Sequence, residues 1–312
     1  MAVYTELSKE QVEEILLSYN LGKLWNFRAI QAGVANSVYS LITTRGEYIL
    51  TLFDQKEAID VRQQAILMDQ LLTSGIPIPE VIGTKSGTPL VFFKDKPVLV
   101  RDYIEGEICR KLSLDNLFTL GTILGKIHTT PVPKAMTYRM PFNPSSFLDL
   151  RKSNKHFGDW ILDKTKLLKT YIPENAPKGV IHGDLFPDNY LVNNGEIVGI
   201  IDLEEACEFF LAYDIAVTLI GNTRSGLDFD IEKVHHFLKG YETIRKISSL
   251  EKENFHYFVT YAASAGAFWR YKQFNMIHPN ENLKDSYLEL MEVANKFEGK
   301  YSNNYVKEFF NY

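Results

Sequence analysis

The chain has 312 residues, of which 45% are apolar and 23% charged, and its formal net charge is -5. This composition is typical of a globular protein with one large domain or two lobes, and the lack of a Lys/Arg-rich block argues against a nucleic-acid partner. No apolar run approaches the roughly 20 residues of a membrane span, and no signal-peptide pattern opens the chain, so we expect a cytoplasmic protein without a membrane partner.

The N-terminal third predicts a mixture of strands and helices. Apolar residues at helical spacing predict helices over Glu6–Tyr19 and Asp60–Leu72, the first with Ser8 as N-cap and Gln11 completing a capping box. Gly46 predicts a hairpin turn between two of the strands. The predicted strands are Ala29–Ala35, Val38–Thr43, Tyr48–Phe53, Pro89–Phe93 and Pro97–Tyr103.

Beyond Gly106 the pattern is mainly helical. Leu114–His128 predicts a helix, with His128 interpreted as its C-terminal cap, and the two cysteines, Cys109 and Cys207, lack metal-binding spacing and are expected to be free thiols. We therefore predict an α+β fold with a sheet-rich N-lobe over residues 1–103 and a helical C-lobe over residues 104–312. Two later helix faces come from Ile231, Val234, Phe237, Leu238, Tyr241 and Ile244, and from Leu283, Tyr287, Leu290 and Ala294.

The stretch from Gly179 to Asp202 predicts a tight loop followed by a β-hairpin. A short apolar strand enters the loop, which holds Asp184 and Asn189. The turn signal Asn-Asn-Gly, which ends at Gly195, folds the chain back into a return strand. Asp202 ends that strand, so we expect its carboxylate beside the loop.

These three polar side chains suit phosphoryl transfer from ATP to an alcohol. Asn189 and Asp202 offer the oxygen ligands that Mg²⁺ prefers, and Asp184 offers a carboxylate to accept a hydrogen bond from the attacking hydroxyl. The simplest alternative is that Asp and Asn only stabilise turns. Another is a metal-dependent hydrolase that uses His182, Asp184 and Asp188. The grouping of three such residues at two strand ends favours the phosphotransferase interpretation.

The motif His182-Gly-Asp-Leu-Phe-Pro-Asp-Asn189, followed by Ile200-Ile-Asp202, resembles the signature of the aminoglycoside phosphotransferase and choline kinase superfamily. The resemblance implies a bilobal protein-kinase-like fold for nearly the whole chain, with Asp184 as base and Asn189 and Asp202 as metal ligands. Tyr213-Asp214-Ile-Ala216 resembles a downstream element of the superfamily in which the Asp is structural. His182 is interpreted as a structural residue that hydrogen-bonds to the loop backbone.

A narrower resemblance is to the bacterial homoserine kinases of this superfamily. It implies transfer of the ATP γ-phosphate to the side-chain hydroxyl of homoserine, a step toward threonine. Choline, a sugar or an aminoglycoside are alternative acceptors, and a non-catalytic nucleotide-binding protein is the competing class. The matching segments are Met1-Ala-Val-Tyr-Thr-Glu-Leu-Ser, Tyr19-Asn-Leu-Gly22, Gly33-Val-Ala-Asn-Ser37, Tyr48-Ile-Leu-Thr-Leu-Phe53 and Arg101-Asp-Tyr-Ile-Glu-Gly106.

Nucleotide contacts are expected in two places. The loop between the first two strands would lie over the phosphates, and the backbone of the connector after the last strand would face the adenine. The residues concerned are Gly33, Asn36 and Ser37 in the loop, and Asp102, Tyr103 and Ile104 in the connector.

Substrate contacts are less specific in the sequence. Arg270 suits a substrate carboxylate, with Arg224 and Arg101 as competitors, although a structural ion pair is an equal alternative. Glu204 and Glu205 are interpreted as a solvated acidic turn, with contact between one of them and a substrate ammonium group as the alternative.

Two features depart from the pattern. Most kinases of this fold carry a Lys in the third strand, paired with a helix Glu, whereas Thr51 and Gln64 stand at those positions. Lys56 or Arg62 is a candidate replacement. The segment Gly221-Asn-Thr-Arg-Ser-Gly226 also lacks the aromatic run usual in homoserine kinases, which bears on the acceptor rather than on the reaction.

Overall fold

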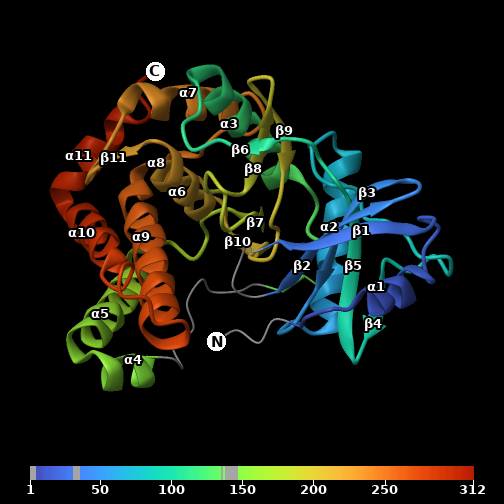
Figure 1. Cartoon of the computed structure of the whole chain (residues 1–312). Helices are drawn as coiled ribbons and strands as arrows, with labels where there is room; N and C mark the ends of the chain where they lie inside the picture. The colour runs from blue at the N-terminus through green and yellow to red at the C-terminus, as the bar shows by residue number, and fades with distance from the viewer. Residues whose placement is uncertain (1–4, 31–35, 135, 138–146) are drawn as a thin grey trace. The chain divides into compact units, whose positions relative to one another are not determined.

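The computed structural model of the chain describes residues 5–30, 36–134, 136–137 and 147–312 (Figure 1). The chain divides into two compact units, each described separately below. The first comprises Met1–Glu107, Pro133–Met136 and Leu191–Glu204, and the second comprises Ile108–Val132, Thr137–Tyr190 and Glu205–Tyr312. The predicted lobes, 1–103 and 104–312, stay a prediction. The first unit contains the whole of the predicted N-lobe, but it also contains most of the hairpin around Gly195, which the prediction assigned to the C-lobe.

A five-stranded antiparallel sheet forms the first unit, in the order β1-β2-β3-β5-β4. Four strands lie where the sequence predicts them. The expected strand Ala29–Ala35 lies mostly outside the described residues, and β1 extends further toward the N-terminus than that prediction. The side chains of this edge strand are mostly exposed, so its sequence lacks the apolar alternation that marks a half-buried strand. The strands are β1 (Leu24–Ile30), β2 (Ser37–Thr43), β3 (Gly46–Leu52), β4 (Leu90–Phe93) and β5 (Lys96–Asp102).

One face of the sheet contributes to a buried apolar cluster. Leu50 and Leu52 of β3 and Val98 and Val100 of β5 share a buried cluster with residues of α1 (Lys9–Leu16). The predicted capping box at the start of α1, between Ser8 and Gln11, is confirmed. The predicted helix over Asp60–Leu72 is confirmed as α2 (Ala58–Thr73).

The predicted hairpin is also confirmed. Strands β8 (Tyr190–Asn193) and β9 (Glu196–Ile200) are neighbours in a three-stranded sheet with β6 (Glu107–Ile108). The turn residues Asn194 and Gly195 have φ angles of 50° and 82°, the positive values that a type I′ turn requires. The amide of Ile200 donates to the carbonyl of Pro77 at 2.6 Å, which holds the end of β9 in the first unit.

The second unit is mainly helical, and one antiparallel pair of strands, β7 (Lys178–Ile181) and β10 (Cys207–Phe210), precedes the central helix α6. Both cysteines are free, as predicted. Leu283 lies before α10 and is exposed, so its predicted place on that helix face is wrong. Across the described ranges, no helix is both long and apolar enough to cross a bilayer.

The helices of this unit are α3 (Leu114–Thr129), α4 (Phe147–Ser153), α5 (Lys155–Tyr171), α6 (Leu211–Asn222), α7 (Ile231–Glu242), α8 (Ser249–Glu253), α9 (Phe255–Tyr271), α10 (Ser286–Glu298) and α11 (Lys300–Glu308), with a π-helical turn at Lys272–Ile277 after α9. A two-residue pairing of β11 (Arg224–Ser225) with β12 (Asp228–Phe229) joins α6 to α7.

Helices α3 and α7 cross with their backbones in contact. A Cβ atom at Gly121 would lie 2.0 Å from the carbonyl oxygen of Phe237, and one at Gly240 would lie 1.9 Å from that of Phe118. Only glycine therefore fits at either position.

We predict that Gly121→Ala or Gly240→Ala lowers the free energy of unfolding by roughly 1–3 kcal/mol, because the added methyl group forces the two backbones apart. The gain in helix propensity from Ala, about 1 kcal/mol, does not offset that loss. Chemical denaturation measures the change. Gly83→Ala is the matched control, because its Cβ meets nothing within 4 Å. Unchanged stability in both helix variants would contradict the close crossing.

Candidate active site

The loop between β7 and β8 is held by one buried carboxylate. Asp214, in the first turn of α6, is 0% exposed and accepts hydrogen bonds from the backbone amides of His182 at 2.7 Å and Gly183 at 2.9 Å. Gly183 has a φ of 83°, and a Cβ there would lie 2.9 Å from the carbonyl oxygen of Glu205. The entry to the loop is therefore fixed at consecutive residues, which supports the structural role predicted for Asp214.

Asp184 and Asn189 come together inside this loop. The amide nitrogen of Asn189 donates to the backbone carbonyl of Asp184 at 2.7 Å and to its carboxylate at 2.9 Å. The backbone amide of Asp184 donates to Nδ1 of His182 at 3.3 Å, a contact that supports the structural interpretation of His182. Because the nitrogen of the Asn189 side chain is used in this way, its oxygen is the atom left to bind a cation.

A chain of polar side chains continues from Asp214 into the helices. Nε2 of His128 lies 3.1 Å from the Asp214 carboxylate, and Nδ1 of His128 lies 2.7 Å from the hydroxyl of Tyr241. Arg245 donates to that hydroxyl at 3.0 Å and forms a salt bridge of 2.8 Å with the fully buried Glu251. The interpretation of His128 as a helix cap is therefore wrong, because its ring points into the core rather than at the end of α3.

The pKa shifts in this chain have opposing causes. Burial lowers the pKa of His128, although the hydrogen bond to Asp214 acts to raise it. Burial also acts to raise the pKa of Asp214, but the hydrogen bond from His128 and the amide of Gly183 outweigh it, and the pKa is lowered. A neutral His128 then donates from Nε2 to an ionised Asp214 and accepts from Tyr241 at Nδ1.

Asn222, at the end of α6, supports the other side of the loop. Its amide nitrogen donates to the carbonyl of Leu185 at 3.0 Å, and its amide oxygen accepts from the hydroxyl of Tyr190 at 2.7 Å. Sequence reasoning named only the segment that contains Asn222 and gave the residue no role, although a polar side chain at the end of a mostly apolar helix was an available signal.

Asp202 and Glu204 lie in the first unit. Asp202 is exposed, with a φ of 60°, and its carboxylate accepts from the amide of Glu204 at 3.3 Å. Glu204 accepts from the side-chain amide of Asn36, and its carbonyl accepts from Lys56 at 2.7 Å. Burial, with a contribution from Asp202, raises the pKa of Glu204, so the interpretation of Glu204 as part of a solvated turn is wrong. The predicted convergence of Asp202 with Asp184 stays a prediction.

The predicted phosphate loop is only partly described. Gly33 lies outside the described residues, and the side chain of Asn36 is buried. The hydroxyl of Ser37 donates to Asp54 at 2.7 Å and accepts from the amide of Thr5 at 2.8 Å. This side chain therefore already links two other segments of the first unit.

The connector has two of its amides in use. The amide of Asp102 donates to the carbonyl of Glu80 at 3.0 Å, and that of Tyr103 donates to the carbonyl of Glu47 at 3.2 Å. The backbone groups of the connector that stay available for the predicted adenine contact are the amide of Ile104 and the carbonyl oxygens.

Arg270 lies in α9 beside a second arginine. The carboxylate of Glu289 in α10 lies 2.9 Å from Arg224 and 3.6 Å from Arg270, and Arg270 donates to the carbonyl of Ser286 at 2.9 Å. The structure therefore contains the ion pair that was one of the alternatives. Binding of a substrate carboxylate by Arg270 stays a prediction.

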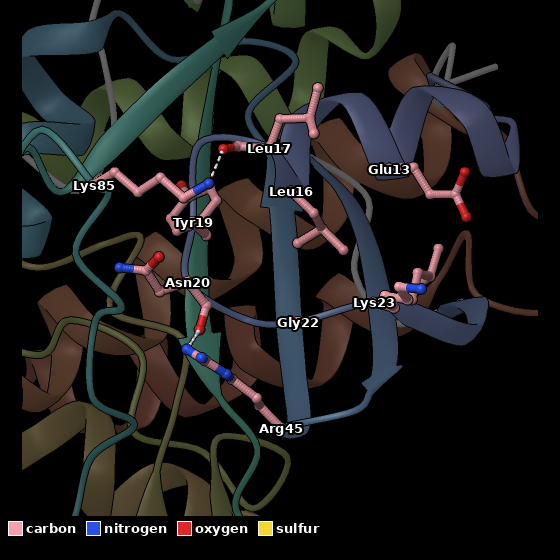
Figure 2. Close-up of a pocket in the computed structure, with 10 residues that line it drawn as sticks. Glu13, Leu16, Leu17, Tyr19, Asn20, Gly22, Lys23, Arg45 and Lys85 are labelled. Atoms are coloured by element: carbon pink, nitrogen blue, oxygen red, sulfur yellow. Dashed lines mark hydrogen bonds between the residues drawn. The ribbon is translucent and has the colours of Figure 1, made fainter.

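Two other groups of residues bear on the location of the site. A cavity of about 470 Å³ in the first unit is lined by the end of α1, the segment that connects it to β1, and Arg45 and Lys85 (Figure 2). The sequence predicts none of these residues to be functional. Among the residues that the structure describes, no three His, Cys, Asp or Glu side chains are placed to hold a metal ion, so a hydrolase built on His182, Asp184 and Asp188 has no support.

Comparisons with known proteins agree with the kinase-like fold predicted from the sequence. The model of the phosphotransferase enzyme family matches residues 26–249. The homoserine kinase of Afipia carboxidovorans is 31% identical over 262 residues, which cover 81% of this chain and 80% of that protein. The homoserine kinase of Gluconobacter oxydans is 33% identical over 264 residues, which cover 81% and 84%.

Two solved structures show the fold. An amicoumacin kinase in complex with AMP-PNP and Ca²⁺ has a TM-score of 0.74 at 15% identity, covering 93% of this chain and 94% of that one. A microcompartment-associated aminopropanol kinase has a TM-score of 0.70 at 17% identity, covering 93% and 95%. The predicted α+β kinase-like fold is confirmed.

The buried His128 predicts a pH dependence of stability. Its folded pKa lies below the ordinary value of 6.5, so its contribution is complete above pH 6.5 and is lost as the pH falls below it. As the pH falls below about 6.5, we expect the unfolding free energy to fall by up to about 1.4 kcal/mol per pH unit from this residue.

Denaturation curves at several pH values test this expectation. His128→Gln should show a smaller pH slope, whereas His156→Gln, at an exposed position, should keep the slope. A residual slope is expected in His128→Gln because burial also lowers the pKa of His256. Identical slopes in the wild type and His128→Gln would contradict the neutral buried ring.

Proposed function

Because the chain belongs to the phosphotransferase enzyme family, and is thus a small-molecule kinase, we propose that it transfers the γ-phosphate of ATP to the side-chain hydroxyl of homoserine with Mg²⁺, a step toward threonine. The observation that carries this proposal is the geometry of the loop that holds Asp184 and Asn189. Its backbone is anchored on Asp214, and its two functional side chains are hydrogen-bonded to each other. The choice of homoserine as the acceptor is supported by relatives named homoserine kinase, which are 31% and 33% identical to this chain.

Asp184 orients the acceptor in this proposal. Its carboxylate accepts a hydrogen bond from the attacking hydroxyl and takes the proton as the bond to the γ-phosphorus forms and the bond from that phosphorus to the oxygen of the leaving ADP breaks. One carboxylate oxygen is fixed by the amide of Asn189, and the backbone on both sides is held by His182 and by Asn222 through Leu185. A base held in this way needs little reorganisation when the substrate binds.

Asn189 and Asp202 would hold Mg²⁺. The donor set fits, because a carboxylate and an amide oxygen are hard ligands, and the amide nitrogen of Asn189 is already turned toward Asp184. When bound, the ion neutralises the charge of the phosphates. In the first unit, Asn36 and the connector from Asp102 to Ile104 are the proposed nucleotide contacts.

We predict that Asp184→Asn lowers kcat by roughly 10²–10⁴-fold, because the variant keeps the size of the side chain but cannot accept the proton. Coupled measurement of ADP release with homoserine and Mg²⁺ tests this. Asp188→Asn is the matched control, since Asp188 is an exposed carboxylate in the same loop. Equal rates for Asp184→Asn and the wild type would reject the role of Asp184.

The acceptor is tested with a panel of alcohols. We expect homoserine to give a kcat/KM well above those of choline, ethanolamine, aminopropanol and an aminoglycoside. We expect EDTA to abolish ADP release with every acceptor that reacts. A faster reaction with any other acceptor would assign that acceptor in place of homoserine. Full activity in EDTA would reject the metal roles of Asn189 and Asp202.

A further inference from the structure

The first unit lacks the lysine that normally contacts the nucleotide phosphates in this fold. Thr51 of β3 stands at the lysine position and is 2% exposed, and Gln64 of α2 stands at the position of its glutamate partner and is 7% exposed. Lysine and glutamate are thus both replaced by neutral side chains. A triphosphate needs a compensating cation close to this position.

The neighbouring strand places a cation there. In the pairing of β3 with β5, Thr51 lies opposite Leu99 and Ile49 lies opposite Arg101. Thr51 and Arg101 are therefore diagonal neighbours on the same face of the sheet, opposite the apolar cluster. Nη2 of Arg101 donates to the hydroxyl of Thr51 at 3.0 Å, so the guanidinium lies over the position that the lysine would occupy.

One buried donor of the Arg101 guanidinium is left unused, beside three carboxylates. Burial acts to lower the pKa of Arg101, and the negative charges of Asp202, Glu204 and Asp102 act against it. The hydrogen bond of the guanidinium is to a neutral hydroxyl, and Nε, which is buried, has no hydrogen-bond partner in the described part of the chain. A cation with an unused buried donor is costly unless an anion binds to it.

The two other candidates fit less well. Lys56 donates to the backbone carbonyl of Glu204, which ties its ammonium group to the segment after Asp202. Arg62 lies on α2 with its side chain exposed.

We propose that Arg101 replaces the absent lysine and binds the α- and β-phosphates of the nucleotide from strand β5. The longer side chain and forked guanidinium of Arg suit this role, because they reach across one strand and contact phosphate oxygens in pairs. Asp202, the proposed metal ligand, acts to raise the pKa of Arg101, so the two charges lie in the same part of the first unit. The identity of the nucleotide rests on the proposed function.

Nucleotide binding without any acceptor tests this proposal. Titration calorimetry with ADP and Mg²⁺ should show Arg101→Gln binding roughly 10–100-fold more weakly than the wild type, as expected for the loss of a charge-assisted contact. Adenosine, which lacks phosphates, should bind to both equally. Arg101→Lys, which keeps the charge, should recover part of the ADP affinity.

Arg62→Gln and Lys56→Gln are the matched controls and should bind ADP more tightly than Arg101→Gln does. The proposal is overturned if Arg101→Gln binds ADP like the wild type, or if ADP and adenosine lose affinity equally. Should Arg101→Gln fail to fold, Arg101→Lys decides alone: a loss of ADP affinity with adenosine binding unchanged supports the role, and unchanged ADP binding rejects it. A wild type that binds ADP but does not phosphorylate homoserine would overturn the proposed acceptor and leave the role of Arg101 intact.

Discussion

The geometry of the candidate active site depends on one buried ion, the carboxylate of Asp214. A charge with no solvent exposure is stable only when hydrogen bonds replace its water, and here two backbone amides and the ring of His128 do so. The position of Asp214 in the first turn of α6 adds the favourable field of the helix N-terminus. Because two of the donors belong to consecutive residues of the loop, stabilising the ion and shaping the loop are the same interaction.

The hydrogen bonds behind Asp214 all run in one direction. Arg245 donates to Tyr241, Tyr241 donates to His128, and His128 donates to Asp214. A single protonation state satisfies each partner, and such a fully satisfied buried network makes a rigid support. The network requires α3 and α7 to pack closely, which Gly121 and Gly240 allow. Small residues at a helix crossing thus contribute to the position of a loop in another part of the same unit.

Sequence patterns predicted local structure better than long-range contacts. The capping box of α1 and the Asn-Asn-Gly turn depend on neighbouring residues, so their patterns were sufficient. His128 and Tyr241 are 113 positions apart, and helical periodicity placed Tyr241 on an apolar face, so nothing local marked their contact. The contact between Arg101 and Thr51 depends on the register of two strands, which residue types alone do not determine.

A non-catalytic nucleotide-binding protein was the competing interpretation of the sequence, since both members of the usual lysine–glutamate pair are missing. Several features that a pure binder does not need are nevertheless retained. Asp214 is kept as a fully buried charge, and Asp202 keeps a left-handed backbone conformation that costs of order 1 kcal/mol or more in a residue other than glycine. The Asp184 carboxylate also keeps its hydrogen bond with Asn189. In the two proposals above, Arg101 supplies nucleotide affinity from the neighbouring strand, whereas the proposed base, Asp184, has a use only if a hydroxyl reacts. Together, these features favour a kinase whose phosphate-binding cation comes from β5 over a protein that binds the nucleotide without reacting.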